Sequence, residues 1–260
     1  MKALILAAGF GTGLEESFRD YQGQYKPQLE QWVAGKPKGL IIIKGKPVVQ
    51  HQLEQLLRAG LTVEDIYVHT NMLYYPQYRT WATSAGLPVA NIFRNAVRDN
   101  EHRLGAVADI QYALNYIPRD NLIIMASDTL LFSDKSMFDL RPIIEGYTKD
   151  KISRMIVYEG ESHTLSRHGL VQVNDQGIVI GFEEKPAHPL SNLVNASVQL
   201  YTSAMVGAIL QANLEPQAES GMIIAHLYPS FPIKVEKASS RLDIGAVEDV
   251  LQANILGEWP

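Results

Sequence analysis

Three glycines lie within five residues, directly after a short apolar run at the N-terminus. They are Gly9, Gly11 and Gly13, and the apolar run is Lys2–Ala7. Glycines at this spacing let the backbone approach a ligand closely and turn its N–H groups toward an anion, so the loop suits nucleotide phosphates. The loop lacks the Gly-Lys-Ser/Thr of a P-loop and the spacing of the dinucleotide fingerprint. Taken alone, it is equally well explained as a glycine turn at the end of a strand.

Positive side chains that could bind phosphate occur in two further segments. Lys36-Pro37-Lys38 precedes a second apolar run, with Lys44 and Lys46 close behind it. A solvated lysine cluster is the more ordinary explanation for these residues. The second segment, Arg103-Leu104-Gly105-Ala106, begins a predicted helix, and helix N-termini attract anions. An ordinary helix start with a packing glycine explains this segment equally well.

Two carboxylates from distant parts of the chain could share a metal ion. Asp128 follows the apolar run Leu122–Met125, and Asp243 stands in Leu242-Asp243-Ile244-Gly245. In open α/β sheets, ligands collect at the carboxyl ends of the strands, where Asp128 is expected. Two such carboxylates could hold a magnesium ion that also takes phosphate oxygens. Individually, each also suits a helix cap or a turn.

A third charged segment ends a predicted hairpin strand. Glu183-Glu184-Lys185-Pro186 contains a Lys–Glu pair that could bind the phosphate and hydroxyls of a sugar phosphate, and Asn195-Ala196-Ser197 follows nearby in the sequence. Without the other motifs, an exposed and charged strand end is the preferred explanation.

The elements that must position these residues differ between the two halves of the chain. In the first half, apolar strands alternate with helical periodicity, which predicts βαβ units and a mostly parallel sheet. The predicted strands are Lys2–Ala7, Asp65–His69, Val89–Phe93 and Leu122–Met125, and the predicted helices are Val48–Ala59, Tyr78–Ala85 and Leu104–Tyr116.

The second half is richer in strands. Its predicted strands are Ser153–Tyr158, Gly169–Val173, Ile178–Glu183, Asn195–Tyr201 and Ile233–Glu236, with helices at Gly221–Tyr228 and Val247–Asn254. Asn174–Gly177 is a hairpin turn between two of these strands. No repeat or linker divides the chain, so residues 1–260 are expected to form a single domain of mixed α/β type.

Composition narrows the class of protein further. The chain has 260 residues, of which 46% are hydrophobic and 20% charged, with a net charge of −5 and no cysteine. These values favour a folded protein over a disordered one, and they exclude disulfides, thiolate catalysis and cysteine-based zinc sites. There is no basic run typical of nucleic-acid binding, no signal peptide and no apolar stretch of the ~18 residues that a membrane span needs. A cytoplasmic protein is expected.

Taken together and in order, the motifs resemble those of the sugar-phosphate nucleotidyltransferase family, which includes glucose-1-phosphate thymidylyl- and uridylyltransferases. The resemblance covers nearly the whole chain. It is carried by Gly9-Phe10-Gly11-Thr12, Pro37-Lys38, Leu104-Gly105-Ala106, Asp128, Glu184-Lys185-Pro186, Asn195-Ala196 and Asp243-Ile244-Gly245. It implies a Rossmann-like domain, similar to that of GT-A glycosyltransferases, with an added β-hairpin.

The resemblance also implies a reaction. A sugar 1-phosphate or similar phosphomonoester attacks the α-phosphorus of a nucleoside triphosphate and releases pyrophosphate, with positioning and charge neutralisation dominating catalysis. Residues 1–130 would mainly bind the nucleotide and residues 131–260 the sugar phosphate. Dimers or tetramers are usual assemblies in the family. The implied nucleotide-binding residues are Ala7, Ala8, Gly9, Gly11, Thr12, Gly13, Leu104 and Gly105; the catalytic ones Lys38, Asp128 and Lys185; the Mg²⁺ ligands Asp128 and Asp243; and the sugar-binding ones Glu184, Lys185 and Asn195.

Several positions depart from the family pattern. Gly13 replaces the arginine of the opening loop, Ser127 a glycine before the metal aspartate, and Ser197 the glycine of N-A-G. Ser239-Ser240-Arg241-Leu242 lacks the expected Gly and Trp. The stretch 15–36 is longer than the usual opening loop, so we expect it to fold over the site as a lid in which Arg19 or Lys26 replaces the lost arginine.

Two functions follow from these residues. The retained lysines and aspartates favour an active Mg²⁺-dependent transferase on an unusual phosphorylated substrate, with activity reduced by the loss of the loop arginine. Gly13 favours the alternative, a catalytically impaired relative that binds a nucleotide or nucleotide sugar and regulates a partner. A GT-A glycosyltransferase would need an Asp-x-Asp motif, which Ser127-Asp128-Thr129 does not supply.

Overall fold

The computed structural model describes residues 1–134 and 136–257. Its main feature is a nine-stranded mixed sheet whose longest path runs β11-β10-β12-β6-β1-β4-β5, with β9 pairing β12 and β13 pairing β9. The strands of this sheet are β1 (Lys2–Ala7), β4 (Ile66–Thr70), β5 (Ile92–Arg94), β6 (Leu122–Ala126), β9 (Ser153–Glu159), β10 (Gly169–Val173), β11 (Val179–Glu184), β12 (Leu193–Tyr201) and β13 (Ile233–Lys237).

The N-terminal half of the sheet is parallel. β1 pairs in parallel with both β4 and β6, and β4 pairs in parallel with β5. The strands are apolar and buried on both faces, as parallel strands covered by helices usually are. Their carboxyl ends therefore meet at one edge, where the chain leaves β1 at Ala7 and β6 at Ala126.

The C-terminal half is mainly antiparallel. β12 runs antiparallel to β6, β9 and β10, and β10 forms a hairpin with β11. Two small sheets lie beside the main one. They contain β7 (Thr129–Ser133), β8 (Ser136–Met137) and β14 (Ser240–Asp243) in one sheet, and β2 (Ile42–Ile43) and β3 (Lys46–Pro47) in the other.

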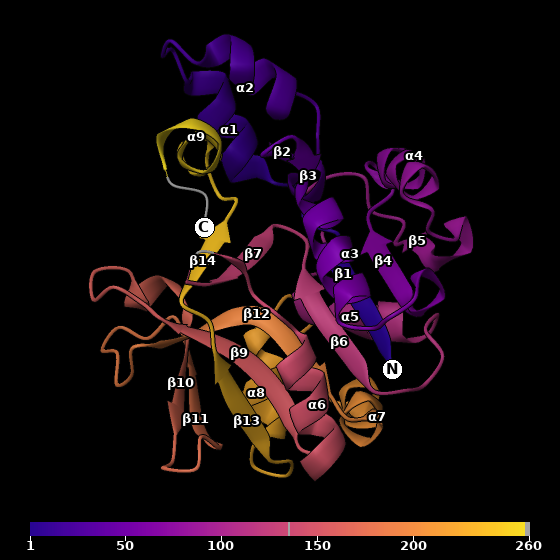
Figure 1. Ribbon diagram of the computed structural model, residues 1–260, viewed down its shortest axis with the longest axis vertical. Coiled ribbons are helices and arrows are strands. Elements are labelled where there is room, and N and C mark those ends of the chain that lie inside the picture. The colour runs from indigo at the N-terminus through magenta and orange to yellow at the C-terminus, as the bar shows by residue number, and fades with distance from the viewer. Residues whose placement is uncertain (135, 258–260) are drawn as a thin grey trace.

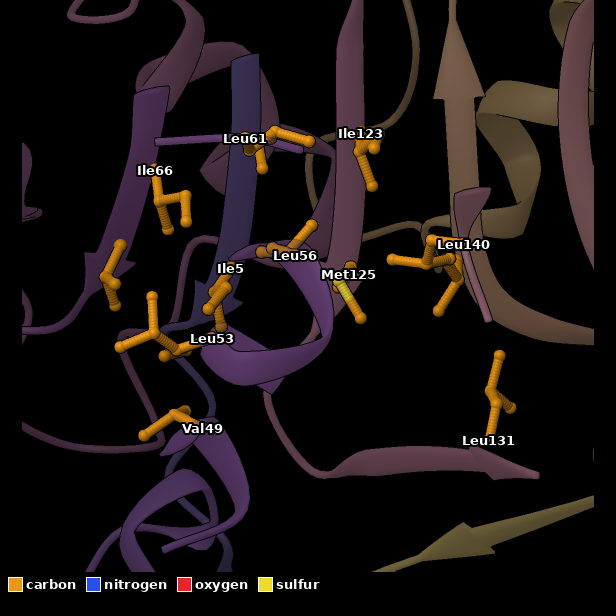
Figure 2. Packing of buried hydrophobic residues seen from close by; sticks show 14 of the residues in the cluster. Ile5, Val49, Leu53, Leu56, Leu61, Ile66, Ile123, Met125, Leu131 and Leu140 are labelled. Atoms are coloured by element: carbon orange, nitrogen blue, oxygen red, sulfur yellow. The ribbon is translucent and has the colours of Figure 1, made fainter. Parts of the chain in front are cut away.

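Helices cover the sheet and close its cores. Figure 2 shows how α3 lays Val49, Leu53 and Leu56 against apolar side chains of the parallel strands, among them Ile5 and Ile123. The α-helices are α1 (Thr12–Asp20), α2 (Lys26–Trp32), α3 (Val48–Arg58), α4 (Tyr75–Ala85), α5 (Ala106–Leu114), α6 (Arg141–Asp150), α7 (Ser203–Gln211), α8 (Gly221–Leu227) and α9 (Val247–Leu251), which continues as a π-helical turn over Gln252–Leu256.

The stretch 15–36, expected as a lid, is folded into helices instead. α1 and α2 pack beside α9 at the top of the molecule in Figure 1. Leu14 and Leu29 are buried there with Val247 and Val250 in a separate apolar cluster. This packing fixes the stretch as part of the fold, away from the position a lid would take.

The predicted α/β fold class is confirmed, and most boundaries agree within a few residues. β1 and β10 begin and end where the sequence placed them, and α3 ends one residue early. The predicted strand at Val89–Phe93 begins instead as a 3₁₀ turn, Val89–Asn91, before β5. The described residues contain no helix with the length and apolar character required to cross a bilayer.

Candidate active site

A pocket of about 500 Å³ opens at the carboxyl ends of β1 and β6. It gathers residues from nearly every part of the chain. Its lining includes Leu6, Ala8–Gly13, Lys38, Tyr78, Asn100, Arg103, Gly105, Ala106, Asp109, Ala126–Thr129, Ser197, Gln217, Glu219, Ser220, Arg241, Asp243 and Gly245. Most of the residues predicted from the glycine loop and the carboxylate motifs therefore share one cavity.

The glycine loop crosses the pocket between β1 and α1. Gly11 has a φ of 70°, a left-handed conformation that favours glycine. A Cβ on Gly11 would lie 3.2 Å from Cγ of Lys38, so the absence of a side chain lets the lysine pass close to the loop. Gly9, Thr12 and Gly13 also line the pocket, which leaves their backbone accessible to a ligand.

The loop is anchored by two side chains that the sequence did not single out. Thr70 Oγ1 donates a 3.0 Å hydrogen bond to the carbonyl of Ala7, and Asn71 Nδ2 donates one of the same length to the carbonyl of Ala8. Both side chains are fully buried. Ala7 itself is buried below the pocket lining, so its contribution to the site is to hold the loop through its backbone.

Lys38 and Asp128 face each other inside the pocket. Lys38 Nζ donates a 3.0 Å hydrogen bond to Oδ2 of Asp128, and both side chains remain about one quarter exposed. Burial lowers the pKa of Lys38, but the attraction and hydrogen bond of Asp128 outweigh it, so the net pKa is raised. The lysine therefore remains charged beside the carboxylate at neutral pH.

Asp243 reaches the same place through strand pairing. In the antiparallel pair β14–β7, Asp243 stands opposite Thr129, and the N–H of Ile244 donates to the carbonyl of Asp128. Arg241 forms an ion pair with Asp243. Burial raises the pKa of Asp243, and the negative charge of Asp128 raises it further, against the opposing effect of Arg241. The negative charges of the two carboxylates therefore repel each other.

The chemistry of this carboxylate pair fits a hard divalent cation. A cation between Asp128 and Asp243 would relieve the repulsion between them, and carboxylate oxygens are the ligands that Mg²⁺ prefers. Among residues 1–134 and 136–257, no group of three or more ligating side chains gathers at one point. Two protein carboxylates suit Mg²⁺, which usually keeps several waters and binds substrate phosphates as well.

The hypothesis that Arg19 or Lys26 replaces the lost loop arginine is wrong. Arg19 is exposed and pairs with its neighbour Asp20, while Lys26 donates to the carbonyl of Phe18 and lies over its ring. Neither lines the pocket, because Arg19 is exposed on α1 and Lys26 is held against Phe18. The arginines that line it are Arg103 and Arg241. Arg241 was visible in the sequence only as a departure from the family pattern.

Gly105 lies at the start of α5 and lines the pocket, whereas its neighbour Leu104 does not. Gly105 has a φ of 94°, and a Cβ there would fall 2.4 Å from both Cα of Gln217 and the carbonyl oxygen of Pro216. Only glycine fits this close approach. The segment around Gln217, which the sequence did not single out, thereby joins the pocket wall.

The predicted sugar-binding residues Glu184 and Lys185 lie at the margin of the pocket, outside its lining. Lys185 Nζ forms an ion pair with Glu219, which does line it. The pKa of Glu184 is raised, first by burial and then by the charge of Glu219, against the effect of Lys185. The three charges therefore form one interacting group beside the cavity.

Asn195 is turned into the protein, where it shapes a bulge in β12. Its Oδ1 accepts hydrogen bonds from the N–H of Ser197 at 3.0 Å and from Nε2 of Gln199 at 2.8 Å. The pairing of β12 with β9 shifts register between Asn195 and Gln199. Ser197, which lines the pocket, is thereby held at a φ of 57°. The serine thus keeps a backbone conformation that favours glycine.

Replacing Ser197 by glycine is expected to stabilise the protein. A non-glycine residue in the left-handed region costs about 1 kcal/mol or more, partly offset by the greater freedom of glycine in the unfolded chain. We expect Ser197→Gly to raise the free energy of unfolding by roughly 0.5–1 kcal/mol, measured by urea denaturation.

Lys151 offers a matched control, because its φ is 59° and it ends α6 outside the pocket lining. Lys151→Gly should give a similar gain in stability. A loss of stability in Ser197→Gly, beside a gain in Lys151→Gly, would show that the serine hydroxyl makes contacts that outweigh the backbone strain.

Comparison with known proteins agrees with this geometry. Residues 33–256 match the Nucleotidyl transferase family. The chain is 28% identical to a UTP–glucose-1-phosphate uridylyltransferase of Haloferax volcanii over 96% of this chain and 93% of that protein. It is 24% identical to a glucose-1-phosphate thymidylyltransferase of Streptomyces antibioticus over 98% of this chain. The chain spans 65% of that second relative's length.

A solved structure shares the fold. A Bacillus anthracis protein described as a glucose-1-phosphate thymidylyltransferase superposes with a TM-score of 0.76 at 20% identity, covering 99% of this chain and 95% of that one. The family match extends over most of the sequence and includes the segments that supply Lys38, Asp128 and Asp243 to the pocket. The chain therefore belongs to the nucleotidyl transferase family.

Proposed function

We propose that this protein is an active nucleotidyltransferase that joins a nucleoside triphosphate to a sugar 1-phosphate or similar phosphomonoester and releases pyrophosphate. The observation that carries the proposal is the convergence of the glycine loop, Lys38 and the Asp128–Asp243 pair in one pocket. These groups lie far apart in the sequence, and together they supply what phosphoryl transfer mainly needs, namely positioning and neutralisation of charge.

The roles of the residues follow from their places. The backbone of Gly9–Thr12 would hold the triphosphate, and Lys38 would neutralise its negative charge. Asp128 and Asp243 would hold Mg²⁺, which, when bound, would neutralise phosphate charge and align the reacting oxygens. Lys185, at the pocket margin, would bind the acceptor phosphate once it leaves Glu219.

In this proposal, the two halves of the chain bind different substrates. Residues 1–130 would mainly bind the nucleotide, and residues 131–260 the acceptor, with Asp243 crossing over to join Asp128. Glu184 would contribute to the acceptor side directly, whereas Asn195 would act by holding Ser197 in the pocket wall. Similarity to the two named transferases supports the proposed reaction, since both names describe a nucleotide joined to a sugar phosphate.

The experiment that tests the proposal is a panel of nucleoside triphosphates and phosphorylated acceptors, with Mg²⁺, in which pyrophosphate release is measured. Release that requires one triphosphate and one acceptor together would establish the transferase. Binding of a nucleotide or nucleotide sugar without release, across the whole panel, would favour a regulatory relative in its place.

Arg241 is expected to replace the arginine that the opening loop lacks. Its side chain is 9% exposed, lines the pocket and forms an ion pair with Asp243. Losing a hydrogen bond to a charged group costs about 1.5–3 kcal/mol, so Arg241→Met should lower kcat/KM roughly ten- to a hundredfold. Steady-state kinetics of pyrophosphate release measure this change.

Arg19→Ala is the control, because Arg19 is exposed and points away from the pocket. It should leave kcat/KM unchanged. Equal losses in the two variants would show that the effect comes from general surface charge and would remove Arg241 from the site.

A further inference from the structure

A buried network holds one carboxylate at the far wall of the pocket. Asp109, in the first turn of α5, receives two hydrogen bonds on the same oxygen, Oδ1. His69 Nε2 lies 2.8 Å from it, and Asn95 Nδ2 donates to it at 2.7 Å. His69 is fully buried and Asn95 nearly so, while Asp109 lines the pocket.

The direction of these bonds follows from the surroundings of His69. Its other ring nitrogen, Nδ1, is buried without a hydrogen-bond partner among the described residues. A buried N–H without an acceptor is rarer than a buried lone pair without a donor, so the hydrogen belongs on Nε2. His69 and Asn95 therefore both donate to Oδ1 of Asp109.

The second oxygen of Asp109 is left for a ligand. Within residues 1–134 and 136–257, both hydrogen bonds to the carboxylate of Asp109 end on Oδ1, and Oδ2 has no hydrogen-bond partner. A carboxylate that served only to tie α5 to β4 and β5 would need no access to the cavity, yet Asp109 lines it. Oδ2 is thus a fixed hydrogen-bond acceptor, with no donor of its own.

The position of Asp109 in the pocket indicates which part of a nucleotide it meets. In the proposed function, on which this step rests, the phosphates lie with Lys38, Asp128 and Asp243. Asp109 lies on α5 beside Gly105, on the side of the pocket formed with β4 and β5. A nucleotide whose phosphates occupy the carboxylate side extends its base toward Gly105 and Asp109.

We propose that Asp109 selects a nucleobase that carries an exocyclic amino group. Cytosine, adenine and guanine present such a donor, whereas the single N–H of the uracil or thymine pairing edge is flanked by two carbonyl oxygens, which repel a carboxylate. The substrate would thus be a cytidine, adenosine or guanosine triphosphate. Two of the relatives, those of Haloferax volcanii and Streptomyces antibioticus, are named for uridylyl and thymidylyl transfer, so this selection sets the chain apart from these two.

The test is nucleotide binding without acceptor, so that it does not depend on turnover. Affinities for the pairs CTP and UTP, ATP and ITP, and GTP and XTP are measured by calorimetry with Mg²⁺, because within each pair a keto group replaces an amino group. Wild type should bind at least one amino-bearing triphosphate about ten- to a hundredfold more tightly than its keto partner, the value of one charged hydrogen bond.

Asp109→Asn gives the sharper result. His69 and Asn95 require an acceptor at the Oδ1 position, so they fix the amide with its oxygen toward them and its NH₂ in the place of Oδ2. The group facing the base changes from acceptor to donor without a change of shape. The preference within the responsive pair should therefore reverse toward the keto base.

Glu219→Gln is the matched control, since it makes the same change of charge in the same pocket, beside Lys185. It should leave the base preference unchanged. Tighter binding of UTP by wild type, an unchanged preference in Asp109→Asn, or the same reversal in Glu219→Gln would each overturn the proposal. Turnover with a uracil preference would overturn this inference alone, and selective binding without turnover would overturn only the transferase function.

Discussion

Asp128→Asn is expected to reduce pyrophosphate release by about three orders of magnitude or more, the largest effect on activity of any single change proposed. Asp128 interacts with two other charged residues of the proposed site, Lys38 and Asp243. It pairs with Lys38, and its charge raises the pKa of Asp243. Removing one group that stabilises transition-state charge typically costs ~10²–10³-fold in rate, and loss of a metal-binding carboxylate adds to this.

The measurement is steady-state release of pyrophosphate with the best substrate pair from the panel, at saturating Mg²⁺. Asp175→Asn supplies the control, because Asp175 is exposed in the hairpin turn between β10 and β11 and lies outside the pocket. Its activity should equal that of wild type. If Asp128→Asn retained more than about a tenth of the activity while remaining folded, the proposed role of the carboxylate pair would be wrong.

The parts of the fold that could be predicted are those with a strong hydrophobic period. β1 is a continuous apolar run that ends at a glycine-rich loop, and α3 repeats apolar residues at helical spacing. α1 and α2 were missed because their sequences are largely polar, and each buries a single residue, Leu14 or Leu29. Packing against α9 stabilises these helices, and such distant contacts leave no periodic signal in the sequence.

The site, like the fold, has residues that could be predicted from the sequence and residues that could not. The order of motifs predicted Lys38, Asp128 and Asp243, and the structure brings them into one pocket. Arg241 and Asp109 could not be predicted, because their places depend on tertiary pairing. The register of β14 against β7 sets where Arg241 stands, and the approach of α5 to β4 brings Asp109 to His69.

Asn195 is a motif residue whose position in this structure does not support the direct sugar contact that the family resemblance implies. The sequence identified it by the Asn-Ala pair, but its amide oxygen is occupied by Ser197 and Gln199. A motif fixes residue type and spacing, while the direction of a side chain depends on which neighbours compete for its hydrogen bonds. At the bulge in β12, the N–H of Ser197 and the side-chain amide of Gln199 both donate to this oxygen, which therefore faces the protein and not the pocket.

Gly105→Ala is expected to destabilise the protein and to weaken nucleotide binding together. A φ of 94° with a ψ of 159° is a conformation almost confined to glycine and costs an alanine at least about 1 kcal/mol, and its Cβ would fall 2.4 Å from the backbone at Pro216 and Gln217. Backbone must then shift, which typically costs a further 1–3 kcal/mol. We expect a loss of roughly 2–4 kcal/mol in the free energy of unfolding, measured by urea denaturation.

The effect on binding has the same physical cause. Gln217 lies directly against Gly105 and lines the pocket together with Glu219, so a segment pushed away by the new Cβ carries part of the pocket wall with it. Affinity for the preferred triphosphate should fall by at least about tenfold in Gly105→Ala, since a wall displaced by an ångström loses contacts that require close geometry. Calorimetric titration of the folded variant measures this loss.

Gly60 provides a control with nearly the same φ. Its φ is 93°, but a Cβ there would meet nothing within 4 Å, and it lies outside the pocket lining. Gly60→Ala should therefore lose only the ~1 kcal/mol of backbone strain and keep full nucleotide affinity. The difference between the two variants measures the steric contact of α5 with the 216–217 segment together with the extra backbone strain at the ψ of 159° of Gly105. Equal stabilities and affinities in both would mean that this contact yields easily and that Gly105 is required for its backbone conformation alone.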